Sequence, residues 1–531
     1  MKSEPRRLTW PKVLLASLVV PPAGIVMSWL LPWTGGWTRR AAGAAGRLAF
    51  SSVLVILTLV YAVALGVLHV EMSGAGWKPI FTLRDPGKDQ DALEKHRKEQ
   101  ASATIPAAAA TAFSNDVTSD EGGWGPGETA PDTSPAGKAA IDPAGPAWPD
   151  FRGPNRDGHY TEGPILTVWP AEGLQRLWRQ PAGGGYASFA IANGKAYTIE
   201  QRREREVVAA YHVDSGRELW THGWTALFAE AMGGDGPRAT PVWDDGRVYA
   251  LGAGGELRVL DAESGKLVWS KDILADNGAE NITWGMSNSP LVVDDSVIVT
   301  PGGPAKSVVA YDKRGGERLW SALSDRAAYT SPMLATLAGQ RQIVVVTATR
   351  IAGLTVDGGK LLWEFPWATF NDISSAQPII TDPNHVFVSA GYDHGSALLE
   401  ISREGQGFSA RRVWENRSMK NRFNSSVHYQ GYIYGLDEGI FACIDANTGE
   451  RKWKAGRYGY GQLLLAGEHI IVLTESGELV LARANPEMLQ EVARFSAIEG
   501  KTWNHPAIAG GTLLVRNARE MAAFRIAPTA P

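Results

Sequence analysis

Cysteine is almost absent from this chain of 531 residues, in which Cys443 is the single thiol. One cysteine excludes an internal disulfide, a CxxCH haem attachment and a zinc site built from four cysteines. Because Cys443 lies in the apolar stretch "GIFACID", we expect it to be a small buried core residue rather than a reactive group.

Familiar catalytic motifs and an excess of positive charge are also missing. The sequence contains no HExxH and no GxSxG, and "GAGGEL" and "GGPAKS" lack the spacing of a dinucleotide or phosphate loop. The formal net charge of −4 gives no bulk attraction to nucleic acid, so no nucleic-acid partner is expected. From residue 148 onward, short apolar runs are not interrupted by a long amphipathic helix, which favours an all-β fold.

Long hydrophobic runs are confined to residues 1–83, which we expect to form a membrane anchor. The segments 13–33 and 48–70 are each about long enough to cross ~30 Å of hydrocarbon as a helix. Pro21 and Pro22 predict a break in the first segment, which then either spans as a kinked helix or re-enters the membrane.

Positive charge sets the expected orientation of this anchor. The short loop between the two hydrophobic segments carries Arg39, Arg40 and Arg47. The N-terminal tail is basic as well, and the positive-inside rule draws both the tail and this loop to the cytoplasm; we favour the loop there. If both segments span the inner (cytoplasmic) membrane, the rest of the chain lies on its extracytoplasmic, periplasmic side.

The composition of residues 84–147 predicts a disordered linker. They begin with the charged stretch "KDQDALEKHRKEQ", which suits a short helix, and continue mainly with Ala, Pro, Gly, Ser and Asp. Too few large apolar side chains remain to offset the entropy of ordering this segment, so we expect it to act as a flexible tether.

The remaining residues, 148–531, contain one pattern many times. Clear copies are "HVDSGRELW", "LDAESGKLVW", "YDKRGGERLW" and "IDANTGERKW", and weaker ones are "LTVDGGKLLW" and "ISREGQGFSARRVW". Successive closing aromatics lie 39 to 51 residues apart, a period typical of propeller blades. Each copy also begins with an apolar pair of residues, a turn and a second apolar run, which we call its opening. Eight such openings occur at the same spacing, so we expect an eight-bladed β-propeller.

The two ends of this region are expected to share a blade. The first closing tryptophan, Trp178, has no opening before it, and the eighth opening, at Asn504, has no tryptophan after it. A strand near 174–180 would complete the sheet begun near 504–526. Such a join closes the ring and removes the open sheet edge.

Each copy has the residues of a tight turn between the last two strands of a blade. Asp and Ser or Thr oxygens accept the N–H groups of the turn, and Gly takes its left-handed position. The aromatic residue that follows would wedge against the neighbouring blade, which is worth on the order of 2–3 kcal/mol per ring. The structural docking residues predicted in this way are Trp178, Trp220, Trp269, Trp320, Trp363, Trp414 and Trp453.

The sequences "IDANTGERKW" and "LDAESGKLVW" resemble the Ala-x-Asp-x-x-Thr-Gly-x-x-x-Trp docking motif of the pyrroloquinoline quinone (PQQ) repeat family. That family forms eight-bladed propellers and includes quinoprotein alcohol dehydrogenases and the propeller lipoprotein of the outer-membrane β-barrel assembly machinery. The resemblance covers about 150–527 and implies the fold. It does not imply an activity, because the motif staples blades together and is not a site.

Departures from the family pattern are informative. The quinoprotein dehydrogenases carry an adjacent cysteine pair against PQQ and hold Ca²⁺ through acidic and amide ligands, and one cysteine cannot form that pair. The assembly lipoprotein is anchored by a lipidated N-terminal cysteine, whereas Cys443 lies far from the N-terminus. The resemblance therefore implies an anchor in the inner membrane and leaves PQQ with calcium as an alternative to no cofactor.

Segments that lead into the inner strand of each blade gather on one face of a propeller, around its central channel. Here they are rich in Arg, Asn, Trp, Tyr and His, and such polar groups among aromatic rings suit a flat, oxygen-rich ligand, a sugar or a peptide. The alternative is that they only satisfy backbone groups and water in the channel. The candidate ligand or partner residues are Arg238, Trp284, Asn288, Arg326, Tyr329, Asp372, Gln377, Arg422, Asn424, Tyr460, Gln462, Trp503, Asn504 and His505.

Three functions compete at this stage. The first is a membrane-tethered, non-enzymatic scaffold that binds protein partners on this loop face, in envelope or outer-membrane protein assembly. The second is a PQQ-dependent oxidoreductase, in which Trp503 or Trp284 stacks on the cofactor and Asp372 is the catalytic base. The third, a sugar-active enzyme, needs paired carboxylates in the funnel, where acidic residues are few.

Overall fold

The computed structural model describes residues 37–64, 69–73, 78–82, 86–102, 145, 147–230, 233–405 and 407–528. The chain divides into two units, Met1–Lys88 and Asp89–Pro531. The first predicted hydrophobic segment, 13–33, lies outside the described residues.

The first unit contains one long helix and a hairpin. Helix α3 spans Trp37–Ala64, and strands β1 (His69–Ser73) and β2 (Lys78–Thr82) pair antiparallel. Two expectations are corrected here. The positions Arg39, Arg40 and Arg47 lie in a helix and not in a loop, because alanine dominates the sequence around them and favours helix. The second hydrophobic segment is not one helix, since α3 ends at Ala64 and β1 begins at His69.

Several apolar side chains on α3 are exposed within the part whose side chains are described, although Leu54 is buried. Leu48, Val53 and Ile56 are 58%, 54% and 60% exposed. Within the described residues, no helix is both long enough and apolar enough to cross a membrane.

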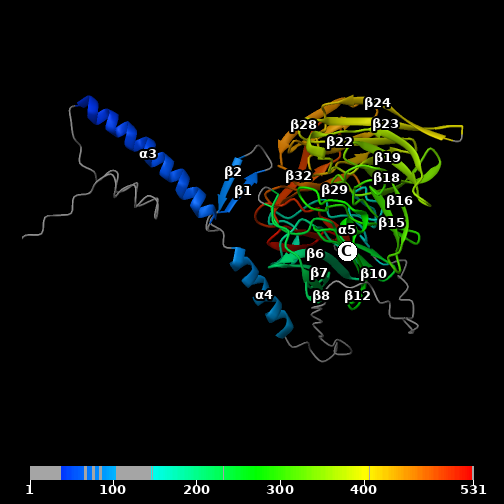
Figure 1. Cartoon of the computed structure of the whole chain (residues 1–531), viewed down its shortest axis with the longest axis horizontal. Helices are drawn as coiled ribbons and strands as arrows, with labels where there is room; N and C mark the ends of the chain where they lie inside the picture. Colours follow the sequence, from blue (N-terminus) through cyan, green and yellow to red (C-terminus); the bar gives the residue numbers. More distant parts are fainter. Residues whose placement is uncertain are drawn as a thin grey trace, which may run out of the picture. The chain divides into compact units, whose positions relative to one another are not determined.

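The second unit is an eight-bladed β-propeller, as the repeat predicts. Each blade is an antiparallel sheet whose four strands follow one another in space (Figure 1). Blades 1 to 4 contain β5 (Ala190–Ala192), β6 (Lys195–Arg202), β7 (Arg205–His212), β8 (Glu218–Thr225); β9 (Val242–Asp244), β10 (Arg247–Leu251), β11 (Glu256–Asp261), β12 (Leu267–Asp272); β13 (Leu291–Val293), β14 (Ser296–Val299), β15 (Val308–Asp312), β16 (Arg318–Ala322); β17 (Met333–Leu337), β18 (Gln340–Val346), β19 (Arg350–Thr355) and β20 (Leu361–Pro366).

Blades 5 to 8 complete the ring. In Figure 1, β22–β24 of blade 5 (yellow) lie on the opposite side of this body from β6–β8 of blade 1. Their strands are β21 (Ile379–Asp382), β22 (His385–Ala390), β23 (Gly395–Glu404), β24 (Gly407–Asn416); β25 (Val427–Tyr429), β26 (Tyr432–Asp437), β27 (Ile440–Asp445), β28 (Arg451–Arg457); β29 (Gln462–Ala466), β30 (His469–Leu473), β31 (Glu478–Arg483), β32 (Gln490–Ser496); and β33 (Ala507–Ala509), β34 (Thr512–Arg516), β35 (Glu520–Arg525) and β4 (Gln175–Pro181). Two short helices, α5 (Ile273–Asn277) and η1 (Phe370–Asp372), lie between blades.

Blade 8 is shared by the two ends of the propeller. Its outer strand is β4, which pairs antiparallel with β35 in the register Trp178 to Ala523. The sequence predicts this join from the unmatched Trp178. The short strand β3 (His159–Tyr160) adds to the inner edge of blade 7 in parallel with β29.

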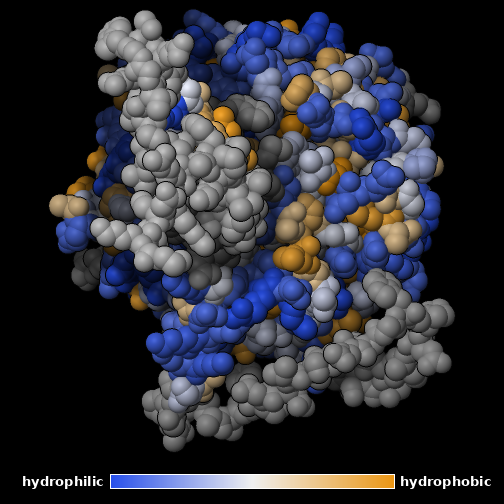
Figure 2. All heavy atoms as spheres, turned by 60° about the vertical axis from the view of Figure 1, so that its left-hand side comes forward, coloured by the Kyte–Doolittle hydropathy of each residue, from blue (hydrophilic) through white to orange (hydrophobic). Residues whose placement is uncertain are grey.

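The hydrophobic core lies between blades and not within one sheet. Phe387 and Leu398 of blade 5, for example, pack with Ile433 and Ile444 of blade 6. The three inner strands of each blade are therefore apolar on both faces, while an outer strand such as β16 alternates between exposed and half-buried side chains. On the face shown in Figure 2, apolar residues occur in small groups among hydrophilic ones.

The closing tryptophans join neighbouring blades. The Trp220 ring lies 2.5 Å from the position that a Cβ would take at Gly265 of the next blade, and its Nε1 donates to the Ala262 carbonyl at 3.1 Å. The glycine contact and the indole hydrogen bond to a carbonyl recur at Trp178, Trp269 and Trp414. The glycine contact alone recurs at Trp320, and the indole of Trp453 donates to the Asn485 carbonyl. Trp363 differs, because it is buried and its Nε1 donates to Gln342 of its own sheet.

Candidate functional site at the mouth of the propeller

Hydroxyl groups link the blades where their inner strands begin. The backbone N–H of Ser188 donates to Thr240 Oγ1 at 2.9 Å, that of Thr240 to Ser289 Oγ at 3.1 Å, and that of Ser289 to Ser331 Oγ at 2.9 Å. Each hydroxyl lies on the blade that follows its donor. These small polar residues hold the inner strands in register around the channel.

Five predicted site residues belong to the same framework. Each is a carboxamide that is almost fully buried and whose NH₂ group donates to backbone carbonyls; Gln462, for example, reaches the carbonyls of Phe423 (2.9 Å) and Trp503 (2.8 Å). Their amide oxygens have no hydrogen-bond partner among the described residues. The five are Asn288, Gln377, Asn424, Gln462 and Asn504. At these positions the geometry favours the structural alternative over direct ligand contact.

A segment before the first blade crosses the centre of the ring. We call residues 148–160 the plug. Trp148 forms a β-bridge with Ile191 of blade 1, and the Pro149 carbonyl accepts from the Trp243 N–H of blade 2 at 2.8 Å. The plug ends in β3, on blade 7. Because it bonds to inner strands on several sides, it lies inside the ring and fills one end of the channel.

Two buried arginines fix the plug to further blades. Arg156 pairs with Asp150 at 2.7 Å and donates to the carbonyls of Ser289 (3.1 Å) and Pro332 (2.6 Å), in blades 3 and 4. Arg152 donates to the Ser426 carbonyl of blade 6 at 2.8 Å. A ligand for the channel must therefore approach from the opposite end, which we call the mouth.

His505 packs against the plug and not at the mouth. Its ring meets that of Phe151 edge to face at 4.9 Å. Burial, with a smaller contribution from the nearby Arg152, holds the pKa of His505 well below its usual range, so the imidazole is neutral. This predicted site residue therefore lies at the plugged end of the channel.

Aromatic rings and cations form a continuous group at the mouth. Trp503 lies 4.4 Å from Phe423 and 5.4 Å from Tyr186, measured between ring centroids. The Lys501 ammonium lies 4.3 Å from the centre of the Trp503 ring, within the range of a cation–π contact. The indole Nε1 of Trp503 donates to Glu475 at 2.9 Å, which fixes the ring.

Arg422 continues this group over blades 5 to 7. Its guanidinium lies 4.6 Å from the centre of the Tyr392 ring and 4.8 Å from that of Tyr460. Glu438 accepts one hydrogen bond from Arg422 Nε and one from the Tyr460 hydroxyl, each at 2.8 Å. Burial, with help from Glu438, raises the pKa of Tyr460, which therefore stays a phenol.

Arg238 occupies the corresponding place over blades 1 and 2. It stacks on Phe228 at 4.7 Å and on Tyr186 at 5.6 Å, and burial lowers its pKa. Trp284 lies beside it, since both side chains approach within 3.3 Å of the Cβ position at Gly233. We define the mouth belt as Tyr186, Phe228, Arg238, Trp284, Tyr329, Tyr392, Arg422, Phe423, Tyr460, Lys501 and Trp503.

Arg326 and Asp372 are the remaining predicted residues and form an ion pair with each other. Arg326 is largely exposed, and Asp372 lies in η1 with a left-handed backbone (φ 59°). A carboxylate already held by a guanidinium is a poor candidate for a general base.

Calcium-bound PQQ does not fit the described side chains well. No group of three or more His, Cys, Asp or Glu side chains among them could hold a metal ion. Cys443 is buried in β27, where burial raises its pKa to about 12, and does not lie in the belt. The stacked rings and arginines of the belt do suit a flat anionic molecule, without a metal shell.

The sequence analysis did not select five belt residues, and one of them, Tyr392, was missed for a topological reason. In a four-stranded antiparallel blade, the connection between the second and third strands lies on the same face as the connection into the inner strand. Tyr392, Glu438 and Glu475 lie in such second connections. Phe423 and Lys501, in contrast, lie within the inspected segments "SMKNRFNSS" and "GKTWNH" and were recoverable.

The ring of eight sheets, stapled by its tryptophan and glycine motif, is similar to propellers of the PQQ-repeat type. The model of the family described as "Outer membrane protein assembly factor BamB" matches residues 204–455. The outer membrane protein assembly factor BamB of Bordetella pertussis is 22% identical over 381 residues, which cover 68% of this chain and 89% of that protein.

Quinohemoprotein alcohol dehydrogenases are similar as well. ADH-IIG of Pseudomonas putida is 30% identical over 144 residues, which are 26% of this chain and only 19% of that enzyme. The crystal structure of the enzyme from Comamonas testosteroni matches with a TM-score of 0.54 at 13% identity, covering 73% of this chain and 81% of that one. At this identity the likeness shows the shared fold alone.

Proposed function

We propose that this chain is a membrane-tethered scaffold that binds a segment of a partner protein at the mouth belt and catalyses no reaction itself. The observation that carries the proposal is the belt, a chain of stacked rings and cations above a plugged channel. Aromatic and arginine side chains dominate the energetics of protein interfaces. Glutamates fix several of them in place, so a partner would meet a preorganised surface.

The similarity to BamB supports a role in outer-membrane or cell-envelope protein assembly. An extended polypeptide suits the belt, because its peptide groups and apolar side chains can lie on aromatic faces while acidic side chains meet Arg238, Arg422 and Lys501.

The tether belongs to the same proposal. Moving the exposed apolar residues of α3 from water into lipid would lower the free energy by about 25 cal/mol for each Å² of apolar surface removed from water. We place the anchor in the inner membrane and the propeller on its periplasmic side. Accessibility of the propeller to protease in spheroplasts, but not in intact cells, is the expected result.

A second candidate function is that of a PQQ-binding oxidoreductase, which the sequence match to a quinohemoprotein alcohol dehydrogenase favours. In that case Trp503 or Trp284 would stack on the cofactor, and Asp372 would need to leave Arg326 before it accepted a proton. This chain's own contribution would be to hold a flat anion between rings and arginines.

Site-specific photo-crosslinking tests the scaffold. A photoreactive amino acid replaces Trp503 in the belt, or Asn447 as a matched control in an exposed turn on the opposite face. We expect discrete protein adducts at 503 that Arg422→Ala removes, and none at 447. Equal adducts at both positions would overturn the proposal.

Calorimetry of the full chain in detergent separates the two functions. PQQ is titrated in with and without Ca²⁺. Micromolar or tighter binding that Trp503→Ala abolishes would replace the scaffold by the quinoprotein. No heat from a folded sample is the result expected for the scaffold.

A further inference from the structure

Helix α4 (Pro86–Ser102) packs on the flank of the propeller. It lies in the segment for which the sequence predicts a linker, and residues 103–144 of that segment lie outside the described residues. Leu93 faces the sheets and is 1% exposed, whereas Lys98 on the other side is exposed. The helix is therefore amphipathic in its contacts although its sequence is mostly charged.

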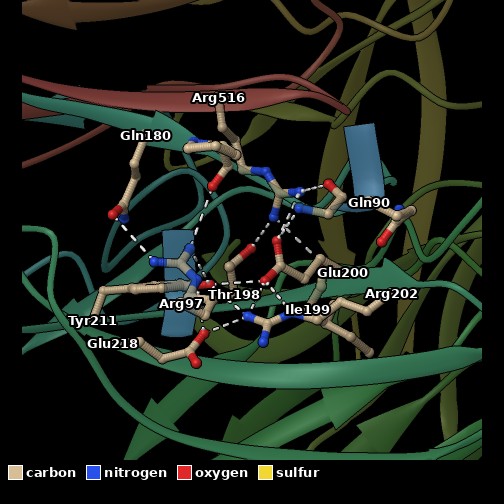
Figure 3. Close-up of polar contacts among 12 residues, drawn as sticks. Gln90, Arg97, Gln180, Thr198, Ile199, Glu200, Arg202, Tyr211, Glu218 and Arg516 are labelled. Atoms are coloured by element: carbon tan, nitrogen blue, oxygen red, sulfur yellow. Dashed lines mark hydrogen bonds and ion pairs between the residues drawn. The ribbon is translucent and has the colours of Figure 1, made fainter. Parts of the chain in front are cut away.

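Arg97 of α4 contacts several residues of the propeller (Figure 3). Its Nη1 donates to Gln180 Oε1 at 3.1 Å, and its Nη2 to the Pro181 carbonyl and the Tyr211 hydroxyl, both at 3.3 Å. Its Nε lies 3.3 Å from Glu218 Oε2, and the guanidinium stacks over the Tyr211 ring at 4.9 Å. Only 10% of the side chain is exposed.

These contacts join both sides of the seam at which the ring closes. Gln180 and Pro181 lie on β4, the outer strand of blade 8, whereas Tyr211 and Glu218 lie on blade 1. The Gln180 side chain accepts from Arg97 and from Gln100 Nε2 (3.0 Å), and its own Nε2 donates to the Gly216 carbonyl at 2.8 Å. One side chain thus connects α4, the closing strand and the first blade.

A buried charge network lies beneath the helix and crosses the same seam. Arg516 of blade 8 donates to Thr198 Oγ1 of blade 1 at 2.6 Å and lies 3.9 Å from Glu200. Arg202 pairs with Glu200 and Glu218, each at 2.5 Å. Burial would raise the pKa of Glu200, but the three guanidiniums around it prevail and lower that pKa to about 2.

The propeller's own charges are balanced without α4. Arg202 and Arg516 match Glu200 and Glu218 in number and are opposite in charge. Arg97 then enters as a third cation, held mainly by oxygens that carry no net charge. Exposed pairs of Arg203 with Asp91 (2.7 Å) and Glu94 (2.5 Å) add little at the surface.

We propose that α4 is a clasp for the ring-closing seam: this chain's own helix occupies a docking surface formed by β4 and β6–β8, with Arg97 as its anchoring residue. The seam differs from other strand pairs because β4 and β35 pair through hydrogen bonds and the Arg179–Glu520 ion pair, without the short covalent turn that joins neighbouring strands in other blades.

Hydrogen exchange of the full chain tests the clasp. Arg97→Ala removes the contacts of the Arg97 guanidinium with β4 and blade 1. Lys98→Ala is the matched control on the exposed side of the same helix. Because buried hydrogen bonds to a charged group are worth about 1.5–3 kcal/mol, Arg97→Ala should speed amide exchange in α4, β4 and β35 about tenfold or more. Blade 5, on the far side of the ring, should be unchanged, and so should every segment in Lys98→Ala.

Two results would overturn the proposal. If α4 exchanges as fast as a free helix in the unaltered chain, it is not docked. If Arg97→Ala releases α4 but leaves β4 and β35 protected, the helix binds the flank without closing the ring. Arg97→Lys, which keeps the charge but loses the planar fork, should give an intermediate rate and so guards against an unfolded Arg97→Ala variant.

Discussion

At the scale of single residues, Glu206 is a buried carboxylate whose environment favours its protonated form. Its Oε1 accepts from the Ala253 N–H at 2.9 Å, and its Oε2 has no hydrogen-bond partner among the described residues. The Oε2 atoms of Glu206 and Glu256 lie 2.2 Å and 3.2 Å from the same point, the Cβ position at Gly252. Burial raises the pKa of Glu206 to about 7, against weaker opposition from Arg238 and Arg258.

This raised pKa predicts a loss of stability as the pH rises. The folded chain binds the proton of Glu206 more tightly than the unfolded chain does, so the contribution is fully present below about pH 4.5 and is lost through about pH 7. The loss is on the order of 3 kcal/mol, and Glu206→Gln should abolish it. Urea denaturation at pH 5, 6, 7 and 8 measures this, with exposed Glu204→Gln as the control. An unchanged pH slope in Glu206→Gln would contradict the assignment.

At the scale of elements, the contact between a closing tryptophan and the next turn is the unit that repeats. The Trp414 ring lies 2.6 Å from the Cβ position at Gly449, which has φ 71°. Gly431 in the same blade has φ 81° and nothing within 4 Å of that position. A substitution at either glycine strains a left-handed backbone, but only a side chain at Gly449 would meet the Trp414 ring.

Comparing two alanine variants therefore isolates the staple. Gly431→Ala should cost about 1–2 kcal/mol from its left-handed backbone alone. Gly449→Ala should cost about 1–3 kcal/mol more, because the new methyl group displaces Trp414 from the neighbouring blade. Chemical denaturation of the two variants gives both values, and equal losses would show that the ring contributes no close packing there.

Sequence reasoning succeeded where both partners of a contact recur in every copy. The glycine turn and the tryptophan after it are such partners. Because no apolar opening precedes Trp178, the sequence also predicted that the two ends share a blade. Contacts whose partners occur once and lie far apart are not visible in the sequence. Trp363 bonds within its own sheet because Gln342 happens to face it. The amides Asn288 and Asn504 look like site residues in the sequence, but the backbone carbonyls that they bind become visible only in the closed ring.

At the scale of the whole molecule, the plug ties distant parts of the ring to one segment. Arg156 bonds to Asp150 and to carbonyls of blades 3 and 4, more than 130 residues away in the chain. Asp150 is itself buried, and burial raises its pKa despite the attraction of Arg156. No local pattern predicts this arrangement, since "WPDFRGPNRDGHY" reads as a polar loop until the eight blades enclose it.

Removing the Arg156 guanidinium should destabilise the ring as one unit. Arg156→Met leaves a buried carboxylate and several carbonyls without a partner, which costs about 3–5 kcal/mol. We expect a melting temperature lower by a few degrees in a single transition, because most blades contact the plug. The exposed Arg176→Met is the control, and Asp150→Asn added to Arg156→Met should recover part of the loss by removing the unpaired charge. Melting at the unaltered temperature would mean that the inner strands hold their places without the plug, and the channel would then be open to ligands from both ends.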